Sequence, residues 1–126
     1  MGRDEVMAWV DRYERAWRDG DVGAVAALFT PDASYRPSPY ESPKVGHDGI
    51  GAFWLDDEDE VFTMRAEPVA VDGRSAVVRV DVRYGEPERQ EYLDLWVLRF
   101  SADGRVEDFV EWAYWPDKPY TAEPQS

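Results

Sequence analysis

The sequence predicts an α+β domain in which three helices come first and a bent, mainly antiparallel sheet follows. Apolar residues recur at helical spacing between residues 6 and 54, whereas after residue 61 they alternate with polar residues in four runs. Short turn sequences separate these runs, and consecutive strands joined by short turns pair antiparallel. A chain of 126 residues with 44% apolar residues has the material for one buried core.

The helices are predicted from their apolar spacing and from the residues at their ends. The first carries one long apolar face and ends at Asp19-Gly20. Asp21 is expected to cap a second, shorter helix, which the turn sequence Thr30-Pro31-Asp32 ends. A short strand at 33–35 and a proline-rich loop follow, and Gly46 then introduces a third helix. The apolar face of the first helix consists of Val6, Trp9, Val10, Tyr13, Ala16 and Trp17.

The four strands are predicted to form a sheet that is apolar on both faces. Alternating apolar residues on two neighbouring strands suggest this: Val78, Val80 and Val82 on one, and Leu93, Leu95 and Val97 on the other. Because the helices cover only one face, we expect a second copy of the chain to cover the other face in a homodimer. The strands are placed at 62–71, 76–84, 91–100 and 106–114.

Residues 1–115 are therefore expected to be one domain, and residues 116–126 an irregular, proline-rich tail. An acidic block at 56–60 is most simply a solvated loop or face.

Charge and composition exclude several classes of function. The 14 Lys and Arg against 27 Asp and Glu give a net charge of -13, which argues against binding to nucleic acid or to an anionic membrane. Without cysteine, and with His47 as the only histidine, a thiolate nucleophile, a zinc centre and a Ser-His-Asp triad are disfavoured. We expect no cofactor and no metal, and His47 is expected to be a surface or capping residue. The first ten residues lack the apolar run of a signal peptide, so a cytoplasmic location is expected.

Several short stretches together resemble the nuclear transport factor 2-like superfamily, which includes SnoaL-like polyketide cyclases, ketosteroid isomerase and limonene epoxide hydrolase. They are Val10-Asp11-Arg12-Tyr13, Gly20-Asp21-Val22, residues 26–33, Gly46 with Ile50 and Phe53, and Gly104-Arg105-Val106. The resemblance covers about residues 6–115 and implies a cone-shaped fold. It specifies the fold more closely than the function, because this scaffold carries several chemistries.

The resemblance also implies roles for individual residues. Tyr13 stands where ketosteroid isomerase has its oxyanion-stabilising tyrosine. Arg79-Val80-Asp81 looks like the Arg-x-Asp pair of limonene epoxide hydrolase, Phe109-Val110-Glu111 like its Trp-x-Asp, and Tyr35 like its water-positioning tyrosine. Pro37 occupies the position of the isomerase's general base and of an asparagine in the hydrolase.

Glu111 is the first candidate for a general base. Its strand alternation places it on the side of Phe109. If that side faces the interior, loss of water would raise the pKa of Glu111 toward neutrality. The alternative is a carboxylate that pairs with an arginine at the rim of the sheet.

Asp81 shares a strand face with Arg79 and Arg83, and two interpretations remain open. In the first, Asp81 and Glu111 act as acid and base with Arg79 between them. In the second, the three residues form a charged ladder on an exposed or dimer-facing side.

Asp94 is a further candidate whose direction depends on the turn at Asp103-Gly104. A two-residue loop aligns Trp96 with Glu111 and turns Asp94 inward. A three-residue loop with Gly104 in the left-handed region aligns Leu95 with Glu111 and turns Asp94 outward.

Aromatic side chains are expected to line a cavity for a small apolar or aromatic molecule, although core packing explains each of them individually. The sequence thus favours a cofactor-free enzyme that uses carboxylate acid–base catalysis, of the isomerase, cyclase, dehydratase or epoxide hydrolase type. The alternative is a non-catalytic ligand-binding or dimerisation module. The residues expected to contact the ligand are Trp17, Phe29, Tyr35, Trp54, Trp96 and Phe109.

Overall fold

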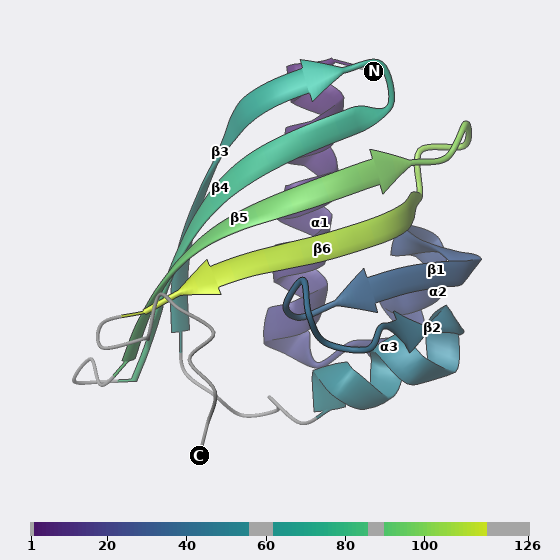
Figure 1. Ribbon diagram of the computed structural model, residues 1–126. Coiled ribbons are helices and arrows are strands. Elements are labelled where there is room, and N and C mark those ends of the chain that lie inside the picture. The colour runs from purple at the N-terminus through teal and green to yellow at the C-terminus, as the bar shows by residue number, and fades with distance from the viewer. Residues whose placement is uncertain (1, 56–61, 86–89, 116–126) are drawn as a thin grey trace.

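A computed structural model describes residues 2–55, 62–85 and 90–115, without the side chains of residues 53–55 and 90. A curved sheet wraps around the long helix α1, and α2 and α3 lie beside the short strands at one end (Figure 1). The predicted α+β arrangement of three helices on a bent sheet is confirmed. In chain order the elements are α1 (Arg3–Asp19), the 3₁₀ turn η1 (Val22–Ala24), α2 (Val25–Leu28), β1 (Phe29–Arg36), β2 (Lys44–Val45), α3 (Gly46–Leu55), β3 (Phe62–Asp72), β4 (Ser75–Tyr84), β5 (Gln90–Phe100) and β6 (Val106–Tyr114).

The sheet is mixed, with the strand order β2-β1-β6-β5-β4-β3. The four long strands form an antiparallel meander, as predicted, and their bounds differ from the predicted ones by no more than a residue at either end. β1 joins the β6 side of this meander and runs parallel to β6, which the sequence did not predict. Residues from the N-terminal third of the chain therefore lie directly beside the last strand.

Helix α1 packs its apolar face against the inner side of the sheet. Val6, Trp9, Val10, Tyr13 and Ala16 are buried, as their spacing predicts. The indole N–H of Trp9 donates a hydrogen bond to the carbonyl of Leu28 at 3.0 Å, which ties α1 to α2. Gly20 ends the helix in the left-handed region, with a φ of 62°.

The second helix is shorter than predicted. Asp21 makes no side-chain capping bond, and the segment contains only the 3₁₀ turn and the single turn of α2. Thr30-Pro31-Asp32, expected to form a turn, lies inside β1 instead. Its pairing with β6 shifts between Phe29 and Ser34, and Pro31, which has no N–H to donate, falls within this interruption. Pairing with a distant strand thus overrides the local turn preference.

Both faces of the sheet carry apolar residues, as predicted. On β4 the inner residues are Val78, Val80 and Val82, which are buried beneath the helices. The outer face carries a group of exposed apolar side chains, here called the outer patch. Its residues are Leu93, Leu95, Val97, Trp112 and Tyr114, each two-fifths to one-half exposed.

The turn between β5 and β6 combines features of the two alternatives left open by the sequence. Gly104 is left-handed, with a φ of 87°, and the N–H of Ser101 bonds to the carbonyl of Arg105 across a three-residue loop. Beyond it the pairing shifts by one residue, from Phe100 with Val106 to Arg99 with Asp108. This bulge restores the alignment of Trp96 with Glu111. Asp94 consequently faces inward although the loop is of the longer kind.

Candidate functional site

Three polar or aromatic side chains of β5 and β6 meet on the inner face of the sheet. Trp96 lies opposite Glu111, and the neighbouring inner pair brings Asp94 opposite Ala113. On the other side of Glu111, Leu98 lies opposite Phe109, and both are fully buried. The carboxyl groups of Asp94 and Glu111 therefore stand above a packed apolar floor.

Tyr35 reaches the same place from β1, because this strand runs parallel to β6 and aligns Tyr35 with Phe109. Its hydroxyl donates a hydrogen bond to Oε1 of Glu111 at 2.8 Å. Its ring packs on that of Phe109, with 4.5 Å between the ring centroids. The phenol is thus held by both its ring and its hydroxyl.

Tyr13 completes the cluster from α1. Its ring lies 5.0 Å from the ring of Trp96 in an edge-on contact and stacks on Phe109 at 5.7 Å. The hydroxyl groups of Tyr13 and Tyr35 are hydrogen-bonded to each other. A connected series of polar groups therefore runs from Tyr13 through Tyr35 and Glu111 to Asp94.

Burial raises the pKa of Glu111 well above its ordinary value, and the hydrogen bond and negative charge of Asp94 raise it further. The bond from Tyr35 acts in the opposite direction, and the charge of the exposed Glu41 adds a small increase. A hydrogen bond between two carboxyl groups requires a proton on one of them. Burial and the charge of Glu111 also raise the pKa of Tyr35, which keeps this hydroxyl a donor.

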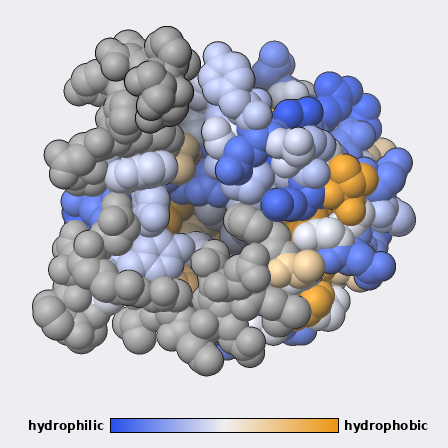
Figure 2. Space-filling model, turned by 60° about the horizontal axis from the view of Figure 1, so that its bottom comes forward, coloured by the Kyte–Doolittle hydropathy of each residue, from blue (hydrophilic) through white to orange (hydrophobic). Residues whose placement is uncertain are grey.

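A second group of aromatic side chains lies beyond Asp94, on the side away from Leu98. Tyr92 precedes Asp94 on the inner face of β5 and contacts Tyr84 at 5.6 Å and Trp115 at 5.5 Å. Trp17 stacks on Phe62 nearby, with 4.2 Å between their centroids. Figure 2 brings the lower end of the molecule in Figure 1 forward and shows a few hydrophobic residues set back among hydrophilic ones. The carboxyl pair thus lies between this second aromatic group and the packed floor.

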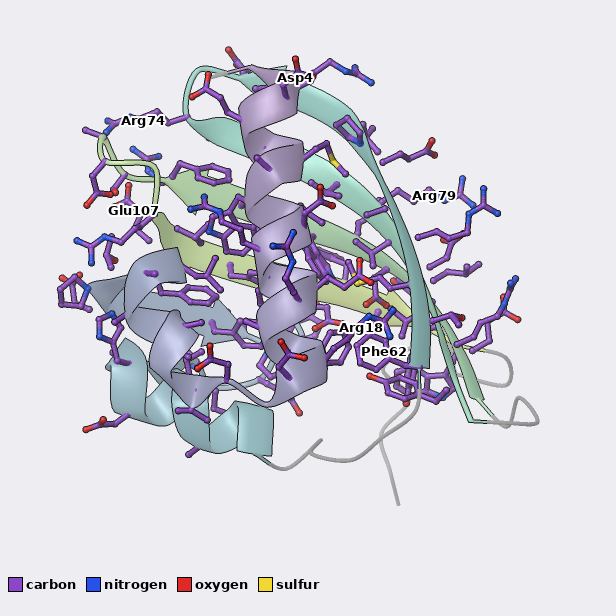
Figure 3. The ribbon with its side chains drawn as sticks, turned by 180° about the vertical axis from the view of Figure 1, so that it is seen from behind. Asp4, Arg18, Phe62, Arg74, Arg79 and Glu107 are labelled. Atoms are coloured by element: carbon purple, nitrogen blue, oxygen red, sulfur yellow. The ribbon has the colours of Figure 1, made fainter. Side chains whose placement is uncertain are left out.

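Arg79 and Asp81 are not part of this cluster, contrary to the interpretation that placed Arg79 between two catalytic carboxylates. On β4 the inner residue Val80 lies opposite Asp94, so its neighbours point to the outer face. Nε of Arg79 pairs there with Oδ1 of Asp81 at 3.5 Å. Figure 3 shows Arg79 on the side of the sheet away from α1. Their position on the outer face is the one that the second alternative, a charged ladder on an exposed or dimer-facing side, expected.

The other three residues predicted to contact the ligand are Phe29, Trp17 and Trp54. Phe29 is fully buried against Trp9, Tyr13 and Phe109, so its position is that of a core residue. Trp17 belongs to the second aromatic group, where it stacks on Phe62, rather than lying beside Glu111. The side chain of Trp54 is outside the described residues, as are the acidic block at 56–60 and the tail at 116–126.

Sequence reasoning missed Glu41, Tyr84 and Tyr92. The alternation on β5 places Tyr92 on the face of Asp94 and Trp96, so that signal was present. Glu41 follows β1 in the proline-rich loop, and nothing in its local sequence marks it as a neighbour of Glu111. His47 Nε2 lies 2.8 Å from the carbonyl oxygen of Phe29, a structural contact between α3 and β1.

Within the ranges that the structure describes, no three His, Cys, Asp or Glu side chains are grouped closely enough to hold a metal ion. No helix in those ranges is both long enough and apolar enough to cross a membrane.

The family model of the SnoaL-like domain matches residues 10–109. The chain belongs to the SnoaL-like family. No curated protein matches this SnoaL-like protein. Its cone-shaped fold is shared by solved structures that are each less than 25% identical to it, so these similarities establish the fold alone.

Three of these structures carry the names of enzymes. One is the epoxide hydrolase/cyclase-like enzyme SalBIII, which is described as having a role in pyran ring formation in the polyether salinomycin. It is 17% identical to this chain with a TM-score of 0.73, and the match covers 86% of this chain and 89% of SalBIII. An LEH-like epoxide hydrolase from M. tuberculosis is 16% identical with a TM-score of 0.68, and the match covers 89% of this chain and 84% of the hydrolase. A candidate ketosteroid isomerase from Kribbella flavida is 20% identical with a TM-score of 0.69, and the match covers 97% of this chain and 84% of the isomerase.

The raised pKa of Glu111 predicts a specific pH dependence of stability. The folded chain binds more protons than the unfolded chain between the ordinary and the raised pKa, so its stability falls as the pH rises through that window. Glu111→Gln removes this loss. Its stability relative to the wild type should therefore increase between about pH 5 and pH 8, by about 1.4 kcal/mol for each unit of the pKa difference.

Urea denaturation at both pH values measures this change. Glu107→Gln is the matched control, because Glu107 lies on the same strand and pairs with Arg99 at 3.4 Å. If Glu111→Gln and the wild type lose stability in parallel as the pH rises, Glu111 has no raised pKa.

Proposed function

We propose that this SnoaL-like protein binds a small apolar molecule inside its cone and transfers protons on it, without a cofactor, by means of Asp94 and Glu111. The observation that carries the proposal is the hydrogen-bonded carboxyl pair on the inner face of the sheet. Burying two acidic groups costs free energy, and a cavity that merely holds an apolar ligand gains nothing from them.

The two carboxyl groups divide the chemistry between them. We propose that the hydrogen-bonded pair rests with one proton and that Glu111, whose pKa burial and Asp94 raise, carries it. Asp94 is then the ionised member and removes a proton from the substrate, while Glu111 donates its proton to a substrate oxygen. This assignment reverses the role that the sequence suggested for Glu111.

Tyr35 and Tyr13 are proposed as positioning residues. The bond from the Tyr35 hydroxyl fixes one oxygen of Glu111, and this leaves the other oxygen for Asp94 or for the substrate. Isomerisation, cyclisation, dehydration and epoxide opening all combine proton removal with proton donation to oxygen, so the pair suits each of these reactions. We propose the second aromatic group, around Tyr92, as the entrance for the substrate, and its rings favour an apolar or aromatic molecule.

A generic proton-transfer probe tests this function. In 5-nitrobenzisoxazole, a base removes the proton from the ring carbon, the N–O bond breaks, and a coloured cyanophenolate forms. Asp94→Asn should lower this rate by about 10²-fold or more, because general-base catalysis contributes about 10² to 10⁴. Absorbance measured under saturating probe gives the rate directly.

Glu107→Gln should retain the full rate, since its side chain pairs with Arg99 outside the cluster. A wild-type rate no greater than that of Asp94→Asn would support the second candidate, a non-catalytic ligand-binding module, and would contradict the catalytic proposal.

We also propose that the outer patch is the contact surface of a homodimer. Its apolar side chains are two-fifths to one-half exposed, a large apolar group for a surface in water. The charges around it have both signs, with the pairs Arg79–Asp81 and Arg99–Glu107 on the same face. Two copies related by a twofold axis could therefore meet there without like-charge repulsion, despite the net charge of -13.

Leu95→Glu tests the dimer, because Leu95 lies within the patch beside Trp112 and is 43% exposed. Sedimentation at micromolar concentration should show a dimer for the wild type and a monomer for the variant. The buried glutamate would cost several kcal/mol at an apolar interface. A wild-type monomer under these conditions contradicts the proposal.

A further inference from the structure

The indole N–H of Trp96 is an unused hydrogen-bond donor. Trp96 is 2% exposed, and within the described part of the chain its Nε1 has no hydrogen-bond partner. An indole nitrogen can only donate, and a buried donor without an acceptor carries a cost of desolvation. Buried polar groups in folded proteins are nearly always paired, so this donor requires an explanation.

Another buried tryptophan of this chain, Trp9, has a hydrogen-bond acceptor for its indole N–H. Trp9 is entirely buried in the core, and its Nε1 donates to the carbonyl of Leu28 at 3.0 Å. The fold therefore provides an acceptor where an indole serves packing alone. Trp96 differs from Trp9 in its location rather than in its burial.

Trp96 lies at the level of the carboxyl pair. It is directly opposite Glu111, and directly opposed residues have Cβ atoms roughly 5 Å apart on one face of the sheet. Asp94 is the next inner residue of β5 toward the entrance, and the packed Leu98 is the next one toward the floor. The rings of Tyr13 and Phe109, which stack on each other, both contact the indole, each at 5.0 Å between centroids.

Tyr35 gives its single hydroxyl proton to Glu111, and Glu111 is hydrogen-bonded to Asp94. Oδ1 of Asp94 is also buried at this level, but the indole N–H does not donate to it. A ligand that enters above the floor would thus find in the indole N–H a donor that no acceptor in the described part of the chain uses.

We infer that the indole N–H of Trp96 binds an oxygen acceptor of the ligand, so that the site selects an apolar molecule carrying a carbonyl, ether or epoxide oxygen over a hydrocarbon of the same shape. The inference rests on the proposed function, because it gives that site its substrate class. It makes Trp96 a specificity-determining residue, in addition to its contribution as an aromatic wall.

Two matched ligands test the inference by calorimetric titration. In 2-acetylnaphthalene a carbonyl oxygen occupies the place of the terminal carbon in 2-isopropenylnaphthalene, and the two molecules otherwise have the same shape. The wild type should bind the ketone about threefold to tenfold more tightly, the effect of one neutral hydrogen bond. In Trp96→Phe this ratio should fall to about one.

The ratio is insensitive to general damage, because any loosening of the pocket in Trp96→Phe weakens both ligands alike. Tyr40→Phe, at an almost fully exposed position outside both the cluster and the outer patch, is the control and should keep the wild-type ratio. A second measurement uses the wild type alone. The indole proton of Trp96 should shift downfield in its proton–nitrogen NMR correlation when the ketone binds, and not when the alkene binds.

Equal affinities for the two ligands in the wild type, or an unchanged ratio in Trp96→Phe, would overturn the inference. These measurements involve no turnover, so they distinguish it from the proposed function. An inactive protein with a Trp96-dependent ketone preference contradicts the catalytic proposal alone, whereas an active protein without that preference contradicts the inference alone. If neither ligand binds, the apolar site that both assume is contradicted.

Discussion

The register of β5 against β6 is the constraint on which the rest of the candidate site depends. Alternation is strict in a strand, so a slip of one residue would exchange Asp94 and Trp96 for Leu93 and Leu95 on the inner face. The bulge that follows the Gly104 turn sets this register. A local irregularity near one end of the hairpin thus decides which side chains surround Glu111 at the other end.

The interior built on this register is unusual in combining aromatic packing with acidic groups. Trp96, Phe109 and Tyr13 contact one another closely, and such rings exclude water from the groups between them. Water exclusion raises the pKa of Glu111, and the proximity of Asp94 raises it further. The raised pKa means that ionising Glu111 costs the folded chain stability, and this is the property that the proposed proton transfer would use. Free energy stored in this way is typical of functional sites rather than of cores.

The sequence predicted those parts of the structure that depend on local patterns. The spacing of apolar residues was sufficient to place helix α1, and the alternation of apolar and polar residues was sufficient to place the four long strands. The same alternation correctly placed Glu111 on the strand face that carries Phe109. The turn predicted at Thr30-Pro31-Asp32 was wrong because that turn preference is local, whereas the pairing of β1 with β6 is not. Alternation also groups Arg79 with Asp81 but cannot say which face is inward, and this is why the sequence left both interpretations of these two residues open.

The central claim is that Asp94 and Glu111 share one proton inside the cone. The most direct measurement is a carbon-13 NMR titration of the side-chain carboxyl carbons in the wild type and in Asp94→Asn. The account predicts that Glu111 titrates well above its ordinary pKa in the wild type and at a lower pH in Asp94→Asn, because the hydrogen bond and charge of Asp94 are then absent. A Glu111 that titrates at its ordinary pKa in the wild type and is unaffected by the substitution would contradict it.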